Sequence, residues 1–176
     1  MLNILAISGS LRAASTNSAL VAALARNAPS GCRVAVYDGL GRLPIFNPDD
    51  EGERTPREAA ALIDAVTGAD GIIVSCPEYA HGVPGGLKNA LDWLVSRDAA
   101  IAKPAMLAHA SQRSLFARAA LAEVMRTMSF ALCEGGIEVA LLGKKPPEVD
   151  GILAEPVSVL AMRNGLTAFA EFIRSR

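Results

Sequence analysis

Short runs of apolar, strand-forming residues alternate along this chain with longer segments whose apolar residues recur at helical spacing. In 17–27, for example, Leu20 and Leu24 fall on one face of a helix, and Pro29 follows as a stop. The pattern predicts five strands, each followed by a helix. The expected strands are 2–8, 33–37, 71–75, 104–109 and 137–142, and the expected helices are 17–27, 57–68, 83–96, 114–132 and 154–173.

Strands that are apolar throughout and are joined by helices indicate a parallel sheet covered on both faces. We therefore expect an α/β three-layer sandwich with a five-stranded parallel sheet of flavodoxin-like order 2-1-3-4-5. The length of 176 residues fits a single domain over 1–176. In such sheets the ligand lies beyond the carboxyl ends of the strands, at the switch between strands 1 and 3.

The composition excludes several classes of protein. Apolar residues make up 51% of the chain and charged residues 20%, which excludes a disordered chain. Lys and Arg number 17 and Asp and Glu 18, so there is no basic excess for nucleic acid or an anionic membrane. The N-terminal segment MLNILAISGS lacks a basic start, so we expect no signal peptide and a cytoplasmic protein. The three cysteines form no disulfide framework, and we expect no metal site.

The loop after the first expected strand, 9–18, opens a helix with small and hydroxyl-bearing residues. Free backbone N–H groups and the positive end of the helix dipole favour an anion there, and Arg12 adds charge. The loop has neither the Gly-x-Gly-x-x-Gly of a dinucleotide site nor the Gly-Lys-Ser/Thr of a Walker loop, so it suits one terminal phosphate. The alternative is ordinary capping of the helix by Ser15 or Asn17.

The loop after the third expected strand, 76–89, contains two prolines and three glycines that shape the turn and expose its backbone. Glycine lets a ring approach the backbone closely, and Tyr79 can present a flat face to a planar ligand. Packing is the alternative for Tyr79 and the preferred interpretation for Trp93.

At these two loops the sequence resembles the NAD(P)H-dependent FMN reductase family, which includes related quinone and azo-dye reductases. The matching pieces are Gly9-Ser10-Leu11-Arg12 with Ser15 and Asn17, and the segment from Pro77-Glu78-Tyr79 through Gly82 to Leu87-Lys88-Asn89-Ala90-Leu91-Asp92-Trp93. The resemblance spans essentially the whole chain and is most specific over 4–18 and 74–94.

The resemblance implies an enzyme that binds FMN, takes hydride from NADPH or NADH at flavin N5, and passes it in a ping-pong reaction to a flavin, quinone or azo-type small molecule. The cofactor carries this chemistry, so no catalytic side chain is required. It also implies a homodimer or homotetramer. The residues expected at the phosphate are Ser10, Arg12, Ser15, Asn17 and Ser18, and those expected along the isoalloxazine are Pro77, Glu78, Tyr79 and Gly82, largely through backbone groups.

One loop departs from the family pattern. The segment 109–119 lacks the paired glycines that the family carries beside the pyrimidine edge of the flavin, although Ser111 and Arg118 resemble their family counterparts. Leu115 and Phe116 stand near the second glycine pair, and a Cβ there can crowd the ring. Either the loop folds differently around FMN or it weakens the affinity. We expect Ser111 to bind the cofactor.

Several single residues have competing interpretations. His81 is a candidate for contact with the ring or for proton supply, with a surface turn as the alternative. We expect His109 to be a hydrogen-bonded structural residue. Cys76 lacks the arginine of a Cys-x5-Arg phosphatase loop, so we expect a small buried hydrophobe. Lys144 and Lys145 are expected in a solvated turn, and the acidic segment within 39–56 in a long surface loop.

Two further functions compete with the reductase. A flavin-poor binding or assembly protein of the same fold would explain the loop without glycines. A one-electron carrier is disfavoured, because such carriers rely on a charged docking face and this chain is near neutral.

Overall fold

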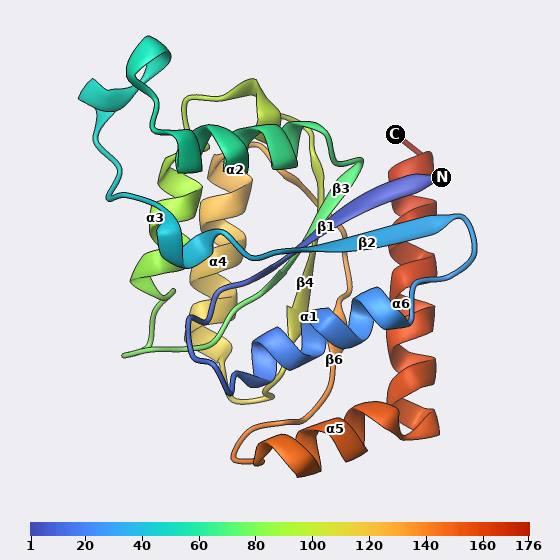
Figure 1. Cartoon of the computed structure of the whole chain (residues 1–176). Helices are drawn as coiled ribbons and strands as arrows, with labels where there is room; N and C mark the ends of the chain where they lie inside the picture. Colours follow the sequence, from blue (N-terminus) through green and yellow to red (C-terminus); the bar gives the residue numbers. More distant parts are fainter.

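A computed structural model describes residues 1–176, and its helices and strands alternate as predicted (Figure 1). The strands are β1 (Leu2–Ser8), β2 (Cys32–Tyr37), β3 (Gly71–Ser75), β4 (Pro104–His109), β5 (Ala131–Leu132) and β6 (Ile137–Glu138). The helices are α1 (Thr16–Arg26), α2 (Arg57–Thr67), α3 (Gly85–Asp92), α4 (Leu115–Thr127), α5 (Pro146–Ala154) and α6 (Pro156–Arg174).

The strands form one parallel sheet in the order β2-β1-β3-β4-β5, with β6 also paired to β4. This confirms the predicted flavodoxin-like order. The reversal between β1 and β3 places the loops that follow these two strands side by side, since the register pairs Ser8 with Ser75 at the carboxyl end.

Helices cover both faces of the sheet, as predicted (Figure 1). Along β1, Leu5 and Ile7 join the core beneath α2, α3 and α4, whereas Ile4 and Ala6 join the core beneath α1, α5 and α6. This alternation follows from the two-residue repeat of a strand, which sends successive side chains to opposite faces. Burial on both faces explains why the central strands are apolar throughout.

The fifth strand was predicted as one continuous run, 137–142, and this is wrong. Two short pieces, β5 and β6, flank a bend in which Gly135 has a φ of +94°. At Gly136 a Cβ would lie 2.5 Å from the carbonyl oxygen of Leu107 on β4, so the bent backbone approaches the sheet too closely for a side chain. Beyond β6 the chain stays bonded to β4, because the N–H groups of Val139 and Leu141 donate to main-chain carbonyls there.

The helix predictions need two corrections near the C-terminus. The expected turn at 143–147 contains the start of a helix that was not predicted, α5, and the expected last helix, 154–173, begins two residues later, at Pro156, because Ala154 is the end of α5. Proline suits the first turn of a helix, because the N–H it lacks has no acceptor there. Glu155 takes an extended conformation with ψ of 140°, because the residue before Pro156 is disfavoured in the α region.

The predicted helix 114–132 also ends early, because Ser129 has a φ of +65° and the chain then enters β5. The long loop after β2 contains three 3-10 turns, at Leu40–Arg42, Pro48–Asp50 and Gly52–Arg54. Trp93 and Asn89 both donate hydrogen bonds of 2.9 Å to the carbonyl oxygen of Pro44, and Trp93 is fully buried. Trp93 is therefore a packing residue, as predicted. None of the helices is both long enough and apolar enough to cross a membrane.

Candidate active site

A cavity of about 540 Å³ opens beyond the carboxyl ends of β1, β3 and β4. Four loops form its wall, and they follow β1, β3, β4 and β6. This is the location expected for a ligand in a sheet of this order. The lining residues are Ser10, Arg12, Ala14, Ser15, Thr16, Asn17, Pro77, Glu78, Tyr79, Ser111, Arg113, Ser114, Leu142, Gly143, Lys144, Lys145 and Pro146.

The cavity brings together most of the residues singled out in the sequence. Ser10, Arg12, Ser15 and Asn17 from the first loop face Pro77, Glu78 and Tyr79 from the second, and Ser111 from the third completes the wall. Two expected residues, Ser18 and Gly82, do not line it. The Oγ atom of Ser18 lies 2.9 Å from Oγ of Ser8 behind the loop.

The loop after β1 caps α1 and still presents donors to the cavity. Oγ of Ser15 accepts a hydrogen bond of 3.2 Å from the N–H of Ser18, so the capping alternative is realised. A hydroxyl that accepts one hydrogen bond retains its own proton to donate. The N–H groups of Thr16 and Asn17, in the first turn of α1, have no acceptor within the helix. Capping and anion binding are therefore compatible here.

Asn17 joins the loops that follow β1 and β3. Its Oδ1 atom accepts a hydrogen bond of 2.9 Å from Oγ of the fully buried Ser75, while its amide nitrogen has no partner in the protein. The guanidinium of Arg12 is likewise free of hydrogen bonds and ion pairs, and this residue is exposed at the cavity wall. These free donors favour an anionic group at the start of α1.

The loop after β3 forms a tight hairpin. Tyr79 and Gly82 exchange two backbone hydrogen bonds of 3.1 and 2.9 Å, and the two residues between them, Ala80 and His81, have φ values of +48° and +59°. The turn holds Tyr79 at the cavity with 48% of its surface exposed, where its ring is free to contact a ligand. The ring of His81 stacks on Phe116 at 4.4 Å and does not line the cavity.

Glu78 and Cys76 both have structural surroundings. A carboxylate oxygen of Glu78 accepts a hydrogen bond of 2.9 Å from the N–H of Ala117 in the first turn of α4. Burial, and the charge of Glu78 to a lesser degree, raise the pKa of the Cys76 thiol to about 12. The thiol therefore stays protonated at neutral pH and is no nucleophile, in line with the expected buried hydrophobe.

The loop after β4, which lacks the family's glycines, leaves the cavity open. Leu115 and Phe116 are 64% and 57% exposed, and neither lines the cavity. Oγ of Ser111 accepts a hydrogen bond of 3.0 Å from the N–H of Arg113 inside the turn. The guanidinium of Arg118 donates to the carbonyl oxygen of Ser111 and pairs with Glu138 at 2.6 Å, which ties this loop to β6.

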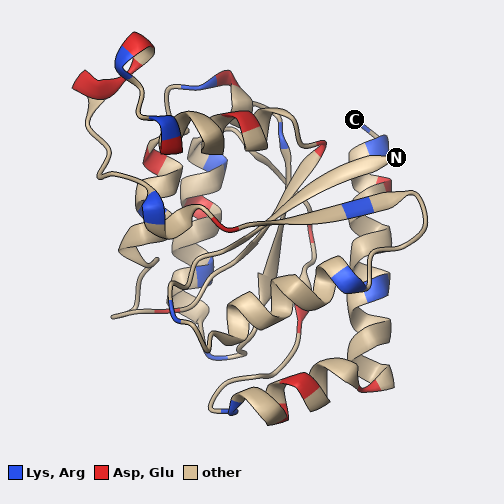
Figure 2. Ribbon diagram, in the orientation of Figure 1, with Lys and Arg blue, Asp and Glu red and all other residues tan.

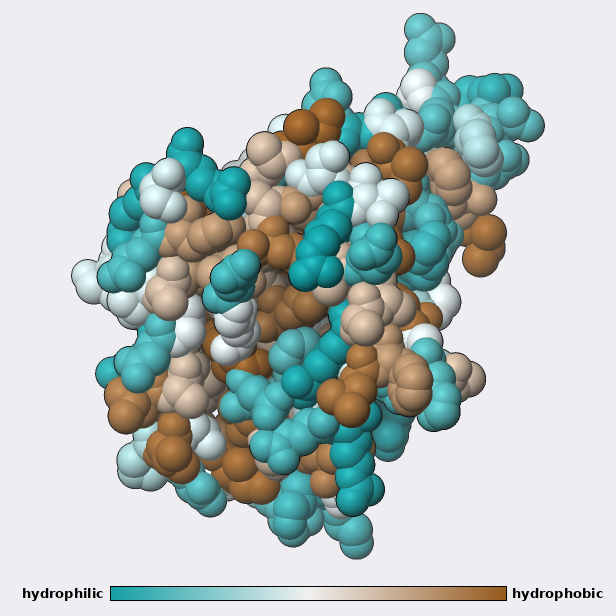
Figure 3. Space-filling model, turned by 180° about the vertical axis from the view of Figure 1, so that it is seen from behind, coloured by the Kyte–Doolittle hydropathy of each residue, from teal (hydrophilic) through white to brown (hydrophobic).

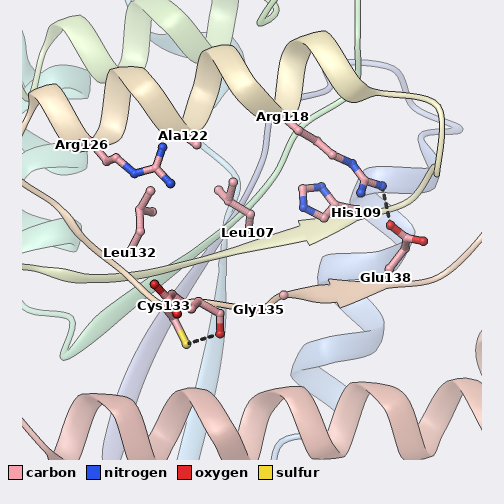
Figure 4. Close-up of a pocket in the computed structure, with 11 residues that line it drawn as sticks. Leu107, His109, Arg118, Ala122, Arg126, Leu132, Cys133, Gly135 and Glu138 are labelled. Atoms are coloured by element: carbon pink, nitrogen blue, oxygen red, sulfur yellow. Dashed lines mark hydrogen bonds and ion pairs between the residues drawn. The ribbon is translucent and has the colours of Figure 1, made fainter.

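A second cavity, of about 570 Å³, lies on the β5 and β6 side of the sheet. Figure 3 shows a hollow on this side, with hydrophobic residues at its floor and hydrophilic residues around it. The close-up in Figure 4 shows Arg118 above β4 with its guanidinium directed at Glu138, and His109 between them and Leu107. The ion pair that anchors the loop of Ser111 thus forms part of this second cavity.

The second cavity changes the expectation for His109. Its ring makes no hydrogen bond to another protein group, so the prediction of a hydrogen-bonded residue is wrong. Burial, followed by the charge of Arg118, lowers the pKa of His109 to about 4 against the opposing charge of Glu138. Burial alone would raise the pKa of Glu138, but hydrogen bonds from Arg118 and Gln112 outweigh it and lower that pKa. His109 is therefore neutral beside a charged ion pair.

Lys144 and Lys145 are exposed in the turn just before α5, as expected, and they also line the first cavity, a position that was not predicted from the sequence. The sequence contained a signal for their position at the cavity, because they follow the fifth predicted strand and the carboxyl ends of parallel strands share one edge of the sheet.

Comparison with known proteins decides the family, because the model of the family described as NADPH-dependent FMN reductase matches residues 2–141. The chain belongs to the NADPH-dependent FMN reductase family. It is 29% identical over 187 residues to the quinone reductase of Escherichia coli K12, with 98% of this chain and 96% of that protein covered. It is 41% identical over 92 residues to a 2-hydroxy-1,4-benzoquinone reductase from Burkholderia sp., covering 52% of this chain and 49% of that protein.

A solved structure gives the same fold. The flavoenzyme NAD(P)H:(acceptor) oxidoreductase FerB from Paracoccus denitrificans superposes with a TM-score of 0.80 at 21% identity, covering 99% of this chain and 98% of that chain. As a member of this family, the chain is an oxidoreductase that uses FMN and NAD(P)H. The cavity fits FMN, since free donors at the start of α1 suit its phosphate and Tyr79 offers a flat face to its ring.

Proposed function

We propose that this protein is an FMN-dependent NAD(P)H oxidoreductase that reduces flavins, quinones or azo-type small molecules with ping-pong kinetics, the donor leaving before the acceptor binds. In this proposal residues 1–176 act as one FMN-binding domain. The proposal includes a homodimer or homotetramer in the cytoplasm, as the family resemblance and the sequence suggest.

One observation carries the proposal: donors without protein partners converge at the start of α1, in a cavity that Tyr79 lines from the opposite loop. We assign the phosphate to Ser10, Arg12, Ser15 and Asn17. The N–H groups of the first turn and the Arg12 guanidinium hold a phosphate dianion by charge-assisted hydrogen bonds. Ser18 acts from behind, through its contact with Ser8, by keeping the loop in shape.

Pro77, Tyr79 and Ser111 form the wall for the flavin ring. Glu78 contributes its backbone to this wall, while its carboxylate accepts the hydrogen bond from the N–H of Ala117 in α4. Gly82 closes the hairpin that presents Tyr79. Bound FMN supplies the hydride chemistry at its N5 atom. The residues of this wall would hold and orient the ring in a cavity that remains open to the donor and the acceptor in turn. His81, stacked on Phe116, is placed beside this wall and has no required catalytic step.

The open cavity also weighs against the competing function of a flavin-poor binding protein. That alternative was motivated by Leu115 and Phe116 in place of glycines, and both side chains point to solvent.

An absorption spectrum of the purified protein, before and after FMN addition and desalting, tests the proposal. Retained flavin bands that NADPH or NADH bleaches, and that a quinone restores, are the expected result. A colourless protein that takes up no FMN would contradict the function and favour the flavin-poor alternative. Arg33→Ala is a matched control for variants of Arg12, because Arg33 is an exposed arginine on β2 that does not line the cavity.

A further inference from the structure

The last residue of β3 is joined to both ends of the loop that follows β1. The carbonyl oxygen of Ser75 accepts a hydrogen bond of 2.8 Å from the N–H of Gly9, where this loop begins. The hydroxyl of Ser75 donates a hydrogen bond of 2.9 Å to Oδ1 of Asn17, in the first turn of α1. One residue of β3 therefore holds the loop to which we assigned the FMN phosphate.

The side chain of Ser75 is placed behind the cavity and cannot touch a ligand. It is fully buried and does not line the cavity, whereas Asn17 is part of the cavity wall. The Ser75 hydroxyl has no hydrogen-bond partner other than Asn17. This hydroxyl can therefore act on a bound ligand only through Asn17.

The hydrogen bond decides which group Asn17 turns to the cavity. A carboxamide has an acceptor oxygen and a donor NH2 group on the same carbon, so an oxygen bound to Ser75 directs the NH2 group away from β3. The Nδ2 atom has no partner in the protein and is not sealed from solvent, so it is accessible at the cavity wall. With the amide reversed, Asn17 would present an oxygen, which repels a phosphate.

The start of α1 depends on neutral donors of this kind. Figure 2 shows no charged residue along α1 before Arg26 in its last turn. An anion at the start of this helix is therefore held by backbone N–H groups, by the helix dipole and by nearby side chains, of which Arg12 is the one cation in the loop. A neutral amide adds to this attraction only when its donor faces the anion.

We propose that Ser75 is a positioning residue for the FMN phosphate, which orients the amide of Asn17 as a donor and thereby increases the preference of the site for FMN over riboflavin. The inference rests on the proposed function and deepens it. FMN and riboflavin differ only in the phosphate, so the preference between them separates this end of the cavity from the wall for the flavin ring.

The test compares the wild type with Ser75→Ala, which removes only the hydroxyl. Fluorescence titration of the flavin-free protein gives the Kd for FMN and the Kd for riboflavin. We expect the variant to bind FMN about three- to tenfold more weakly, the size of one ordinary hydrogen bond, and to bind riboflavin as the wild type does. Phosphorus NMR of bound FMN at saturation should show a shifted phosphate resonance in the variant.

Two further variants show whether the effect passes through Asn17. Asn17→Ala should itself weaken FMN binding, and adding Ser75→Ala to it should change the Kd for FMN no further, because the hydroxyl then has no amide to orient. Ser158→Ala removes another buried serine hydroxyl, on α6 and outside the cavity, and should bind both flavins as the wild type does.

Three results would overturn the role of Ser75 in a wild type that binds FMN. The first is an unchanged Kd for FMN and an unchanged phosphate resonance in Ser75→Ala. The second is an equal loss of affinity for FMN and riboflavin, which would leave Ser75 a general structural role at the end of β3. The third is an additive loss in the double variant, which would exclude Asn17 as the intermediary. Absence of FMN uptake by the wild type contradicts the proposed function, and the inference fails with it.

Discussion

The carboxylate of Glu78 and the backbone N–H of Ala117 form a hydrogen bond of 2.9 Å that joins two loops 39 residues apart in the sequence. The contact places a negative charge in the first turn of α4, where the helix dipole favours it. It also ties the loop that presents Tyr79 to the loop that carries Ser111. One side chain thus fixes the relative position of two walls of the active-site cavity.

Replacing Glu78 tests this connection. We expect Glu78→Ala to lower the free energy of unfolding by about 1–2 kcal/mol and to weaken FMN retention, because the N–H of Ala117 loses its acceptor and the two loops separate. Denaturant unfolding and FMN titration measure the two effects. Glu123→Ala, at an exposed position of the same helix, should change neither. FMN affinity equal to wild type in Glu78→Ala would show that the loops hold their positions without this contact.

Arg12 provides the second prediction. Its guanidinium lies free at the cavity wall near the start of α1, so Arg12→Ala should weaken FMN binding by about 1.5–3 kcal/mol, the range for a charge-assisted hydrogen bond. Fluorescence titration of FMN measures the Kd. Unaltered affinity would remove Arg12 from the phosphate site, and Arg33→Ala supplies the comparison for a lost charge elsewhere.

The hairpin at Tyr79 provides the third prediction. Ala80 has a φ of +48°, a conformation that costs a residue with a Cβ about 1 kcal/mol and glycine almost nothing. We expect Ala80→Gly to raise the Tm by about 2–4 °C, the shift that ~1 kcal/mol produces in a chain of this size. Ala161→Gly, at an exposed position within α6, should have the opposite effect, because glycine destabilises a helix. Calorimetric scans of both variants decide the sign.

His109 provides a prediction on pH. Its pKa is about 4 in the folded protein, lowered mainly by burial, and about 6.5 in the unfolded chain. Between these values the unfolded state binds the extra proton, so stability should fall as the pH decreases from about 6.5 to about 4. With allowance for solvent screening, the loss is on the order of 2 kcal/mol.

His109→Gln should remove that slope, as followed by denaturant unfolding at a series of pH values. Glu138 contributes at lower pH. Its pKa is lowered in the folded state, so its stabilisation is complete above the unfolded value of about 4.3 and is lost as the pH falls through the folded one. An unchanged slope between about pH 4 and 6.5 in His109→Gln would exclude His109 as its source.

The sequence by itself determined the layered architecture and the location of the site. The residue ranges of β1, β3 and β4 agree with the predicted ones, because strands buried on both faces must be continuously apolar and so stand out from the helices between them. The order of the strands followed from the crossover rule, and the order placed the loops after β1, β3 and β4 at one edge.

Only the tertiary structure decided the remaining features. The sheet edge carries β5 and β6 with a bend between them, because the approach of Gly136 to Leu107 depends on a strand distant in the sequence. The exposure of Leu115 and Phe116, the position of Lys144 and Lys145 at the cavity wall, and the hydrogen bond of Glu78 likewise depend on neighbours that no local pattern records. Periodicity reports which face of an element is buried, whereas the direction of a loop side chain is set by the elements that pack around it.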